Sequence, residues 1–261
     1  MPRHNPHNGT HRVIAVANQK GGVGKTTTAV NLAAALAARG RRVLLIDIDP
    51  QGNSTTALGV EKTRVERCVY DVLLKNAALG DVTIATKVEG LSLVPATLNL
   101  AGAELELVSA LSREQRLRSA LRVARGKYDD IVIDCPPSLG LLTLNALTAA
   151  NWLIIPVQAE YLALEGLGQL TGVIELVRTH LNEELRMMGV LITMYDGRTN
   201  LATQVVAEVE NYFPGEVFAT RIPRTVRLSE APSYGAPIAT FDPKSKGAVA
   251  YAALADEVLA R

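Results

Sequence analysis

The chain has 261 residues, of which 48% are apolar and 20% charged, so it can bury a substantial core and lacks the composition of a disordered protein. Its 27 basic and 26 acidic residues nearly cancel, so any nucleic-acid binding must come from a local patch. The two cysteines are far apart, which argues against a local zinc or iron–sulfur motif. The N-terminus is unlike a signal peptide, and no apolar run reaches the roughly 18 residues of a membrane helix, so we expect a cytoplasmic protein.

Predicted strands and helices alternate along the chain. Residues 1–11 are expected to form a flexible polar arm, in which three histidines suggest a metal site but a solvated tail is the simpler interpretation. An apolar run over 13–17 predicts a buried strand, and after a glycine-rich turn the composition of 26–39 predicts a helix that ends near Gly40. Further strands are predicted at 43–46, 91–94, 131–133, 153–155 and 190–192, and further helices at 102–125, 141–150, 163–180, 200–212 and 246–260.

This alternation predicts the fold class. Continuously apolar strands separated by helices indicate a doubly wound α/β fold, with a mostly parallel sheet and helices on both faces. No Pro/Ser-rich linker interrupts the pattern, so residues 12–261 are expected to form a single domain. Ligands of such folds bind at the carboxyl ends of the strands.

A glycine-rich segment follows the first predicted strand and opens the first helix. Its glycines let backbone N–H groups surround an anion, and the helix start adds positive potential. Lys25 is predicted to reach the β- and γ-phosphates of ATP, and the Thr26 hydroxyl to bind Mg²⁺. Gln19 departs from the generic GxxxxGK pattern, and the alternative is an ordinary glycine turn with a solvated lysine. The predicted nucleotide-binding residues of this segment are Lys20, Gly21, Gly22, Val23, Gly24, Lys25, Thr26 and Thr27.

Acidic residues end two of the predicted strands. Asp47 and Asp49 are two residues apart, so both can face the phosphate site, one organising Mg²⁺ through water and the other orienting the attacking water. The alternative is that they cap a turn before Pro50. Asp134 ends the strand over 131–133, at a position where a carboxylate holds Mg²⁺. Cys135 has no neighbouring base, which favours a small buried residue over a nucleophile.

KGGVGKTT resembles the deviant Walker A motif of the ParA/MinD family of ATPases. The segments DIDPQGN and DCPPS resemble the switch segments of that family, and IPRTVRLSEAPSYG points to its chromosomal ParA branch, the Soj proteins. The resemblance implies an ATP-sandwich homodimer in which Lys20 reaches the partner's ATP. It also implies that Asp49 acts in hydrolysis, and that Pro223, Arg224 and Thr225 lie at the adenine, although the Soj pattern usually has Asn at position 225.

The resemblance also implies that the dimer binds double-stranded DNA without sequence preference and is therefore nucleoid-associated. Arg198 and Arg227 match family positions that contact DNA. Residues 221–246 hold five basic and two acidic residues, a net charge of +3 that suits phosphate contacts. The family further implies a ParB-type centromere-binding partner that stimulates hydrolysis. The predicted DNA-binding residues are Arg198, Arg224, Arg227, Lys244 and Lys246.

Three alternatives remain open at this stage. A second basic patch lies at 113–127, where Arg118, Arg122 and Arg125 share one helical face. A MinD-like positioning ATPase would end in a basic amphipathic helix that binds membranes, but this chain ends with two acids, so no membrane partner is expected. A metabolic P-loop ligase would transfer phosphate to a small substrate instead.

Overall fold

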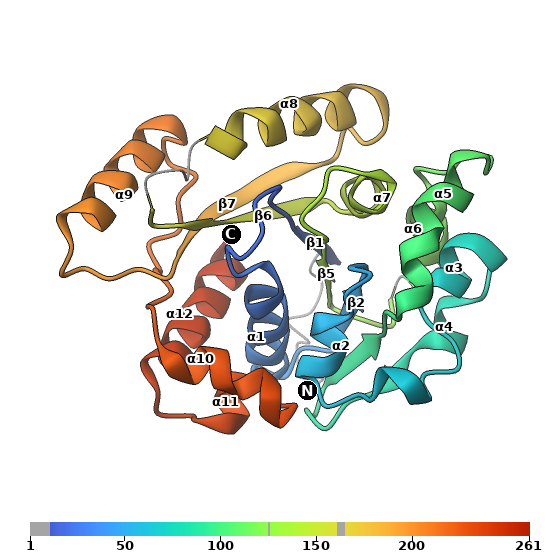
Figure 1. The fold of residues 1–261 in the computed structure, drawn as a ribbon, viewed down its shortest axis with the longest axis horizontal. Helices are drawn as coiled ribbons and strands as arrows, with labels where there is room; N and C mark the ends of the chain where they lie inside the picture. The colour runs from blue at the N-terminus through green and yellow to red at the C-terminus, as the bar shows by residue number, and fades with distance from the viewer. Residues whose placement is uncertain (1–10, 125, 161–164) are drawn as a thin grey trace, which may run out of the picture.

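The central element of the fold is a seven-stranded sheet with the order β3-β4-β2-β5-β1-β6-β7 (Figure 1). The computed structural model describes residues 11–124, 126–160 and 165–261, so the expected polar arm lies outside the described residues except for His11. β3 runs antiparallel to β4, and the other neighbouring strands are parallel. The strands are β1 (Arg12–Val16), β2 (Val43–Asp47), β3 (Ile84–Ala85), β4 (Leu91–Val94), β5 (Asp130–Asp134), β6 (Trp152–Gln158) and β7 (Arg186–Thr193).

The inner strands are apolar because both faces of the sheet are covered. Every residue of β2 and β5 is buried, as expected for parallel strands between helical layers. In the register of the sheet, Asp134 lies beside Val16 on one side and beside Asp47 on the other. The carboxyl ends of β1, β5 and β2 therefore meet at one edge of the sheet.

Two hydrophobic clusters lie on opposite faces of the sheet, since Ile14 and Val16 belong to one cluster and Ala15 to the other. In Figure 1, α1 and α12 lie on one side of the sheet, and α7 and α8 on the other. The cluster with Ile14 contains residues of α1 (Lys25–Ala37), α2 (Asn53–Ala57), α10 (Val226–Glu230), α11 (Ile238–Phe241) and α12 (Lys246–Ala260). The cluster with Ala15 contains residues of α3 (Val69–Lys75), α4 (Leu79–Val82), α5 (Ala103–Val108), α6 (Arg116–Ala124), α7 (Leu141–Ala149), α8 (Glu165–His180) and α9 (Asn200–Tyr212).

The predicted fold class is confirmed, and the predicted helices at 200–212 and 246–260 match α9 and α12. The single helix predicted over 102–125 is wrong. The structure has α5 and α6 there, separated by a turn in which Ser112 adopts a φ of +50°, a conformation that no helix interior allows. The short α2, α3, α4 and β3 were not predicted, because each is too brief to show a period.

No helix in the described part of the chain is long and apolar enough to cross a membrane. The helix predicted over 163–180 begins at Glu165 in the structure, and its first two positions lie outside the described residues. The expectation of one domain over residues 12–261 stays a prediction.

Candidate functional site

The glycine-rich loop joins β1 to α1 at the carboxyl edge of the sheet (Figure 1). Gly22 and Gly24 have φ angles of +74° and +86°, in the left-handed region that favours glycine. No side chain caps the start of α1, so backbone N–H groups there remain available to an anion. The Thr193 hydroxyl at the end of β7 donates to the carbonyl of Val23 at 2.9 Å and holds the loop in place. The loop therefore has the form that phosphate binding requires.

The two lysines of the loop have different surroundings. Lys25 is 7% exposed, and its Nζ donates to the Lys20 carbonyl at 2.9 Å. Burial lowers the pKa of the Lys25 ammonium, and the negative charge of Asp134 opposes this effect. Lys20 is half-buried, and its side chain makes no hydrogen bond or ion pair with any described residue. Lys25 is thus held over the loop, whereas the Lys20 ammonium is available to another group.

Two buried carboxylates stand side by side where β2 and β5 end. Asp47 and Asp134 are aligned in the sheet and fully buried. Asp47 Oδ2 accepts hydrogen bonds from the N–H and hydroxyl of Thr55 at 2.8 and 2.7 Å, and Asp134 Oδ2 accepts one from the Ser54 hydroxyl at 2.8 Å. Burial, reinforced by the charge of Asp47, raises the pKa of Asp134 to about 8, and burial raises the pKa of Asp47 to about 6. A cation would stabilise both carboxylates in their charged form.

Asp49 lies in the turn that follows these carboxylates. Its Oδ1 accepts from the backbone N–H of Gln51 at 2.9 Å, and its own N–H donates to Asp47 Oδ1 at 3.2 Å. These two oxygens accept hydrogen bonds within the turn, and the role of Asp49 in hydrolysis stays a prediction. Cys135 is fully buried, and burial raises the pKa of its thiol, which fits the expected small buried residue rather than a nucleophile.

The residues around Asp134 fit a magnesium ion. Asp134 Oδ1 is buried and has no hydrogen-bond partner among the described residues. The Thr26 hydroxyl lies close enough to affect the pKa of this carboxyl. No cluster of three or more His, Cys, Asp or Glu side chains suited to a metal occurs in the described ranges. Mg²⁺ needs no such cluster, because it commonly binds one or two carboxylates together with waters and substrate phosphates.

A cavity of about 440 Å³ lies beside the loop. Its lining includes Gly24 and Thr27 together with residues 223–225, and the assignment of the latter to the adenine stays a prediction. The Thr225 hydroxyl accepts a hydrogen bond from the N–H of Arg227 at 3.3 Å, because it caps α10. A base in this cavity would therefore meet the backbone of residues 223–225 more readily than the Thr225 hydroxyl.

The predicted DNA-binding residues are exposed, but two of them have acidic partners. Arg198 Nη2 lies 2.6 Å from Asp196 Oδ2. Arg227 pairs with Glu230 at 3.0 Å and with Asp242 at 3.4 Å. A backbone bridge between Tyr195 and Pro223 brings the segment of Arg198 beside the start of α10. We call the following residues the basic surface: Arg198, Arg224, Arg227, Lys244 and Lys246.

Sequence reasoning missed the polar residues that hold the site together. Ser54 and Thr55 bind the two carboxylates, and they directly follow the segment DIDPQGN, so their position offered a signal. Asn18 accepts from the Lys20 N–H at 3.0 Å and donates to the Pro156 carbonyl at 2.7 Å. Thr193 comes from a distant strand, so only the folded chain reveals its contact with the loop.

Comparisons with known proteins agree with this geometry. A family model described as an AAA domain matches residues 11–187. The sporulation initiation inhibitor protein Soj of Bacillus subtilis is 60% identical over 249 residues, which is 95% of this chain and 98% of that protein. The chromosome partitioning protein ParA of Myxococcus xanthus is 54% identical over 250 residues, which is 96% of this chain and 88% of that one.

Solved structures of nucleotide-binding proteins also resemble this chain. A cobyrinic acid a,c-diamide synthase from Mycobacterium smegmatis, with bound ADP and magnesium, has a TM-score of 0.85 and 43% identity, covering 96% of this chain and 94% of that chain. The septum site-determining protein MinD from Pyrococcus horikoshii, complexed with Mg-ADP, has a TM-score of 0.78 and 28% identity, covering 95% and 96% of the two chains. The resemblance to the ParA/MinD family is thereby confirmed, and the chain belongs to the Soj/ParA family of chromosome-partitioning ATPases.

Proposed function

We propose that this chain binds and hydrolyses ATP at the glycine-rich loop and uses the cycle to move DNA during partitioning. The observation that carries the proposal is the carboxyl edge of the sheet. A loop with left-handed glycines, the buried ammonium of Lys25 and an unpartnered carboxylate oxygen of Asp134 lie together there. Within the described part of the chain, Asp134 Oδ1 has no hydrogen-bond partner and no side chain caps the start of α1, and Mg-ATP would supply partners for both. Relatives named for chromosome partitioning support the same activity.

At the loop, the chain's own residues bind and orient the nucleotide. Lys25 donates to the β- and γ-phosphates, and the free N–H groups at the start of α1 surround them. Thr26 and Asp134 would hold Mg²⁺, with Asp47 acting through water, and the ion would supply positive charge beside the phosphates. Asp49, fixed by its turn, orients the attacking water.

Two subunits close around ATP in this proposal. Lys20 is suited to the contact across the dimer, because its ammonium has no partner among the described residues while its backbone is fixed by Asn18. Closure joins the two basic surfaces into one, which doubles the phosphate contacts to non-specific double-stranded DNA. Affinity then rises steeply, because each contact releases counterions. Loss of the γ-phosphate reopens the dimer and releases the DNA.

A ParB-type centromere-binding protein is the proposed stimulator of hydrolysis, and the chain is then a cytoplasmic, nucleoid-associated protein. One experiment tests the whole cycle. The ATPase rate is measured with duplex DNA, with a ParB-type protein from the same organism, and with both. We expect slow turnover alone and the largest rate with both partners. A rate that neither partner changes would contradict the partitioning role while leaving ATP hydrolysis intact.

A second candidate function has one specific observation in its favour. The structural neighbour with 43% identity is titled a cobyrinic acid a,c-diamide synthase, which is a metabolic enzyme. Turnover that depends on a cobyrinic acid substrate and ignores DNA would establish this alternative. A MinD-like role predicts ATP-dependent sedimentation with liposomes, which we do not expect here.

A further inference from the structure

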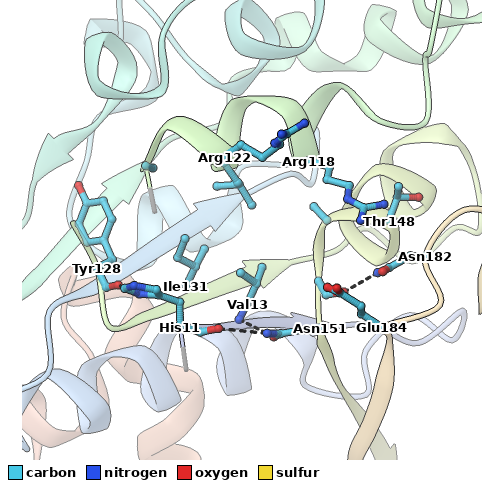
Figure 2. Close-up of a pocket in the computed structure, with 14 residues that line it drawn as sticks. His11, Val13, Arg118, Arg122, Tyr128, Ile131, Thr148, Asn151, Asn182 and Glu184 are labelled. Atoms are coloured by element: carbon cyan, nitrogen blue, oxygen red, sulfur yellow. Dashed lines mark hydrogen bonds between the residues drawn. The ribbon is translucent and has the colours of Figure 1, made fainter. Parts of the chain in front are cut away.

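A second cavity, of about 250 Å³, opens at the amino end of the sheet (Figure 2). β1 and β5 begin beside it, where Val13 and Ile131 line its wall, and both strands end at the nucleotide site. The cavity and the glycine-rich loop therefore lie at opposite edges of the sheet. No step of the proposed ATP cycle uses the residues around this cavity.

α6 gives the cavity its positive charge through Arg118 and Arg122, which are four residues apart and share one helical face. They belong to the second basic patch of the sequence, whose Arg125 lies outside the described residues. Arg118 Nη1 donates to the Leu181 carbonyl at 3.1 Å, which holds this side chain in place. The Arg122 guanidinium has no hydrogen-bond or ion-pair partner in the described part of the chain.

Other polar residues of the cavity, Glu184 and Asn182 among them, can accept hydrogen bonds. Glu184 lies on the wall opposite the two arginines, as Figure 2 shows. Asn182 donates its two amide hydrogens to the carbonyls of Leu147 and Ala150, at 2.9 and 2.6 Å, so its Oδ1 remains as an acceptor. The Thr148 hydroxyl is buried without a partner among the described residues. This hydroxyl has almost no surface exposed to the cavity, so the acceptors that a ligand would meet are Glu184 and Asn182.

We propose that this cavity binds a phosphomonoester of a small hydroxylated molecule, either a sugar phosphate or a nucleoside monophosphate. Arg118 and Arg122 bind the phosphate, since guanidinium groups match phosphate oxygens in charge and geometry. Glu184 and Asn182 accept hydrogen bonds from hydroxyl groups. Apolar carbon atoms of the ligand pack against the wall that includes Ile131.

The shape and charge of the cavity favour such a ligand over duplex DNA. DNA binding requires an open surface on which several cations reach successive phosphates. Here the two arginines line a concave site, and the carboxylate of Glu184 faces them. That carboxylate provides an acceptor for the hydroxyl groups of a small phosphate ester, which the backbone of duplex DNA does not offer.

Isothermal titration of the whole chain tests the proposal, using ribose 5-phosphate, AMP, inorganic phosphate and ribose, each with and without Mg-ADP. We expect ribose 5-phosphate to bind in both conditions, inorganic phosphate to bind more weakly, and ribose not to bind. Arg122→Ala should weaken binding at least about tenfold without affecting the fold, because the Arg122 guanidinium has no hydrogen-bond or ion-pair partner among the described residues. Arg116→Ala is the matched control. Arg116 lies on the same helix but donates to Asn76 at 2.8 Å and lines a different groove.

The same titrations decide whether the ligand is a sugar phosphate or a nucleoside monophosphate. Binding of ribose 5-phosphate but not AMP assigns a sugar phosphate, and tighter binding of AMP assigns a nucleotide.

Four results would overturn the proposal. These are no binding of any phosphate at millimolar concentration, equal losses in Arg122→Ala and Arg116→Ala, displacement of the ligand by Mg-ADP, and no effect of Arg122→Ala. If no phosphate ester binds and Arg122→Glu weakens DNA binding as much as Arg227→Glu, α6 belongs to a DNA-binding surface instead. The titrations with phosphate esters do not depend on the proposed ATP cycle, because the cavity shares no lining residue with the pocket beside the glycine-rich loop. The DNA comparison alone rests on the proposed role of Arg227.

Discussion

The nucleotide site and the basic surface differ in how their charges are satisfied within the chain. Among the described residues of the nucleotide site, one oxygen of Asp134 has no hydrogen-bond partner and Lys25 donates to a backbone carbonyl alone. On the basic surface, Arg198 and Arg227 already pair with acidic side chains. A ligand at the first site fills vacant hydrogen-bonding positions, whereas DNA at the second must displace internal partners. The nucleotide site is therefore preorganised for its ligand, whereas the arginines of the basic surface must exchange acidic partners for DNA phosphates.

Lys25→Met should have the largest effect, because it removes the only ammonium held over the loop in the described structure. We expect the ATPase rate to fall about 1,000-fold, the upper range for losing one charge-stabilising group. Lys62→Met is the matched control, since Lys62 also donates to a backbone carbonyl, that of Gln51 at 2.7 Å, but lies outside the loop. Equal losses of activity in the two variants would contradict the assignment.

The nucleotide site was predictable because its residues occupy short, continuous motifs. KGGVGKTT and the aspartates at strand ends indicate where each group lies once the strands are parallel, and the structure brings Asp47, Asp134 and the loop to one edge. The acid partners of the arginines were harder to predict. Asp196 is two residues from Arg198, but Asp242 is fifteen residues from Arg227 and reaches it only through the packing of α10 and α11.

Lys20→Ala tests whether the unpartnered lysine acts across the dimer. In an Asp49→Ala background, which should slow hydrolysis, we expect the dissociation constant of the ATP dimer to rise about 100-fold, because a buried intersubunit charge contact is lost. Analytical ultracentrifugation with ATP measures it. Lys87→Ala removes an equal charge from an exposed turn and should leave the dimer unchanged. If the Lys20→Ala variant forms an ATP dimer of normal stability, Lys20 acts only within its own subunit.

A close contact between two glycines joins the segment after α2 to the segment after α10. Gly59 follows α2 near the carboxylates, and Gly235 follows the short helix after α10. A Cβ on Gly235, whose φ is +62°, would lie 2.6 Å from the Gly59 Cα. The contact therefore requires glycine on both sides, which sequence periodicity does not reveal.

Gly235→Ala should lower the free energy of unfolding by about 2 kcal/mol, from backbone strain together with the clash. Gly215→Ala is the control, since Gly215 also has a left-handed φ, +77°, but has open space around its Cβ position. It should cost about 1 kcal/mol. Urea unfolding measures both values, and equal costs would show that the glycine contact is not tight.

Asp196→Asn should have the smallest effect of these substitutions. Unlike the others it should improve a function, because it should raise the affinity for duplex DNA. The hydrogen bond from Arg198 lowers the pKa of Asp196 to about 2, so the acid is charged in ordinary buffers and competes with DNA for the arginine. We expect duplex affinity to rise about threefold at low salt, with the gain shrinking as salt increases.

Asp256→Asn controls for net charge, since Asp256 forms an exposed pair with Arg39, at the far end of α1 from the loop. A gain in both variants would indicate a general charge effect. A gain in neither would place DNA away from Arg198. A gain confined to Asp196→Asn would mean that the acid partners of the basic surface set its affinity, so that DNA binding stays weak until dimerisation doubles the number of phosphate contacts.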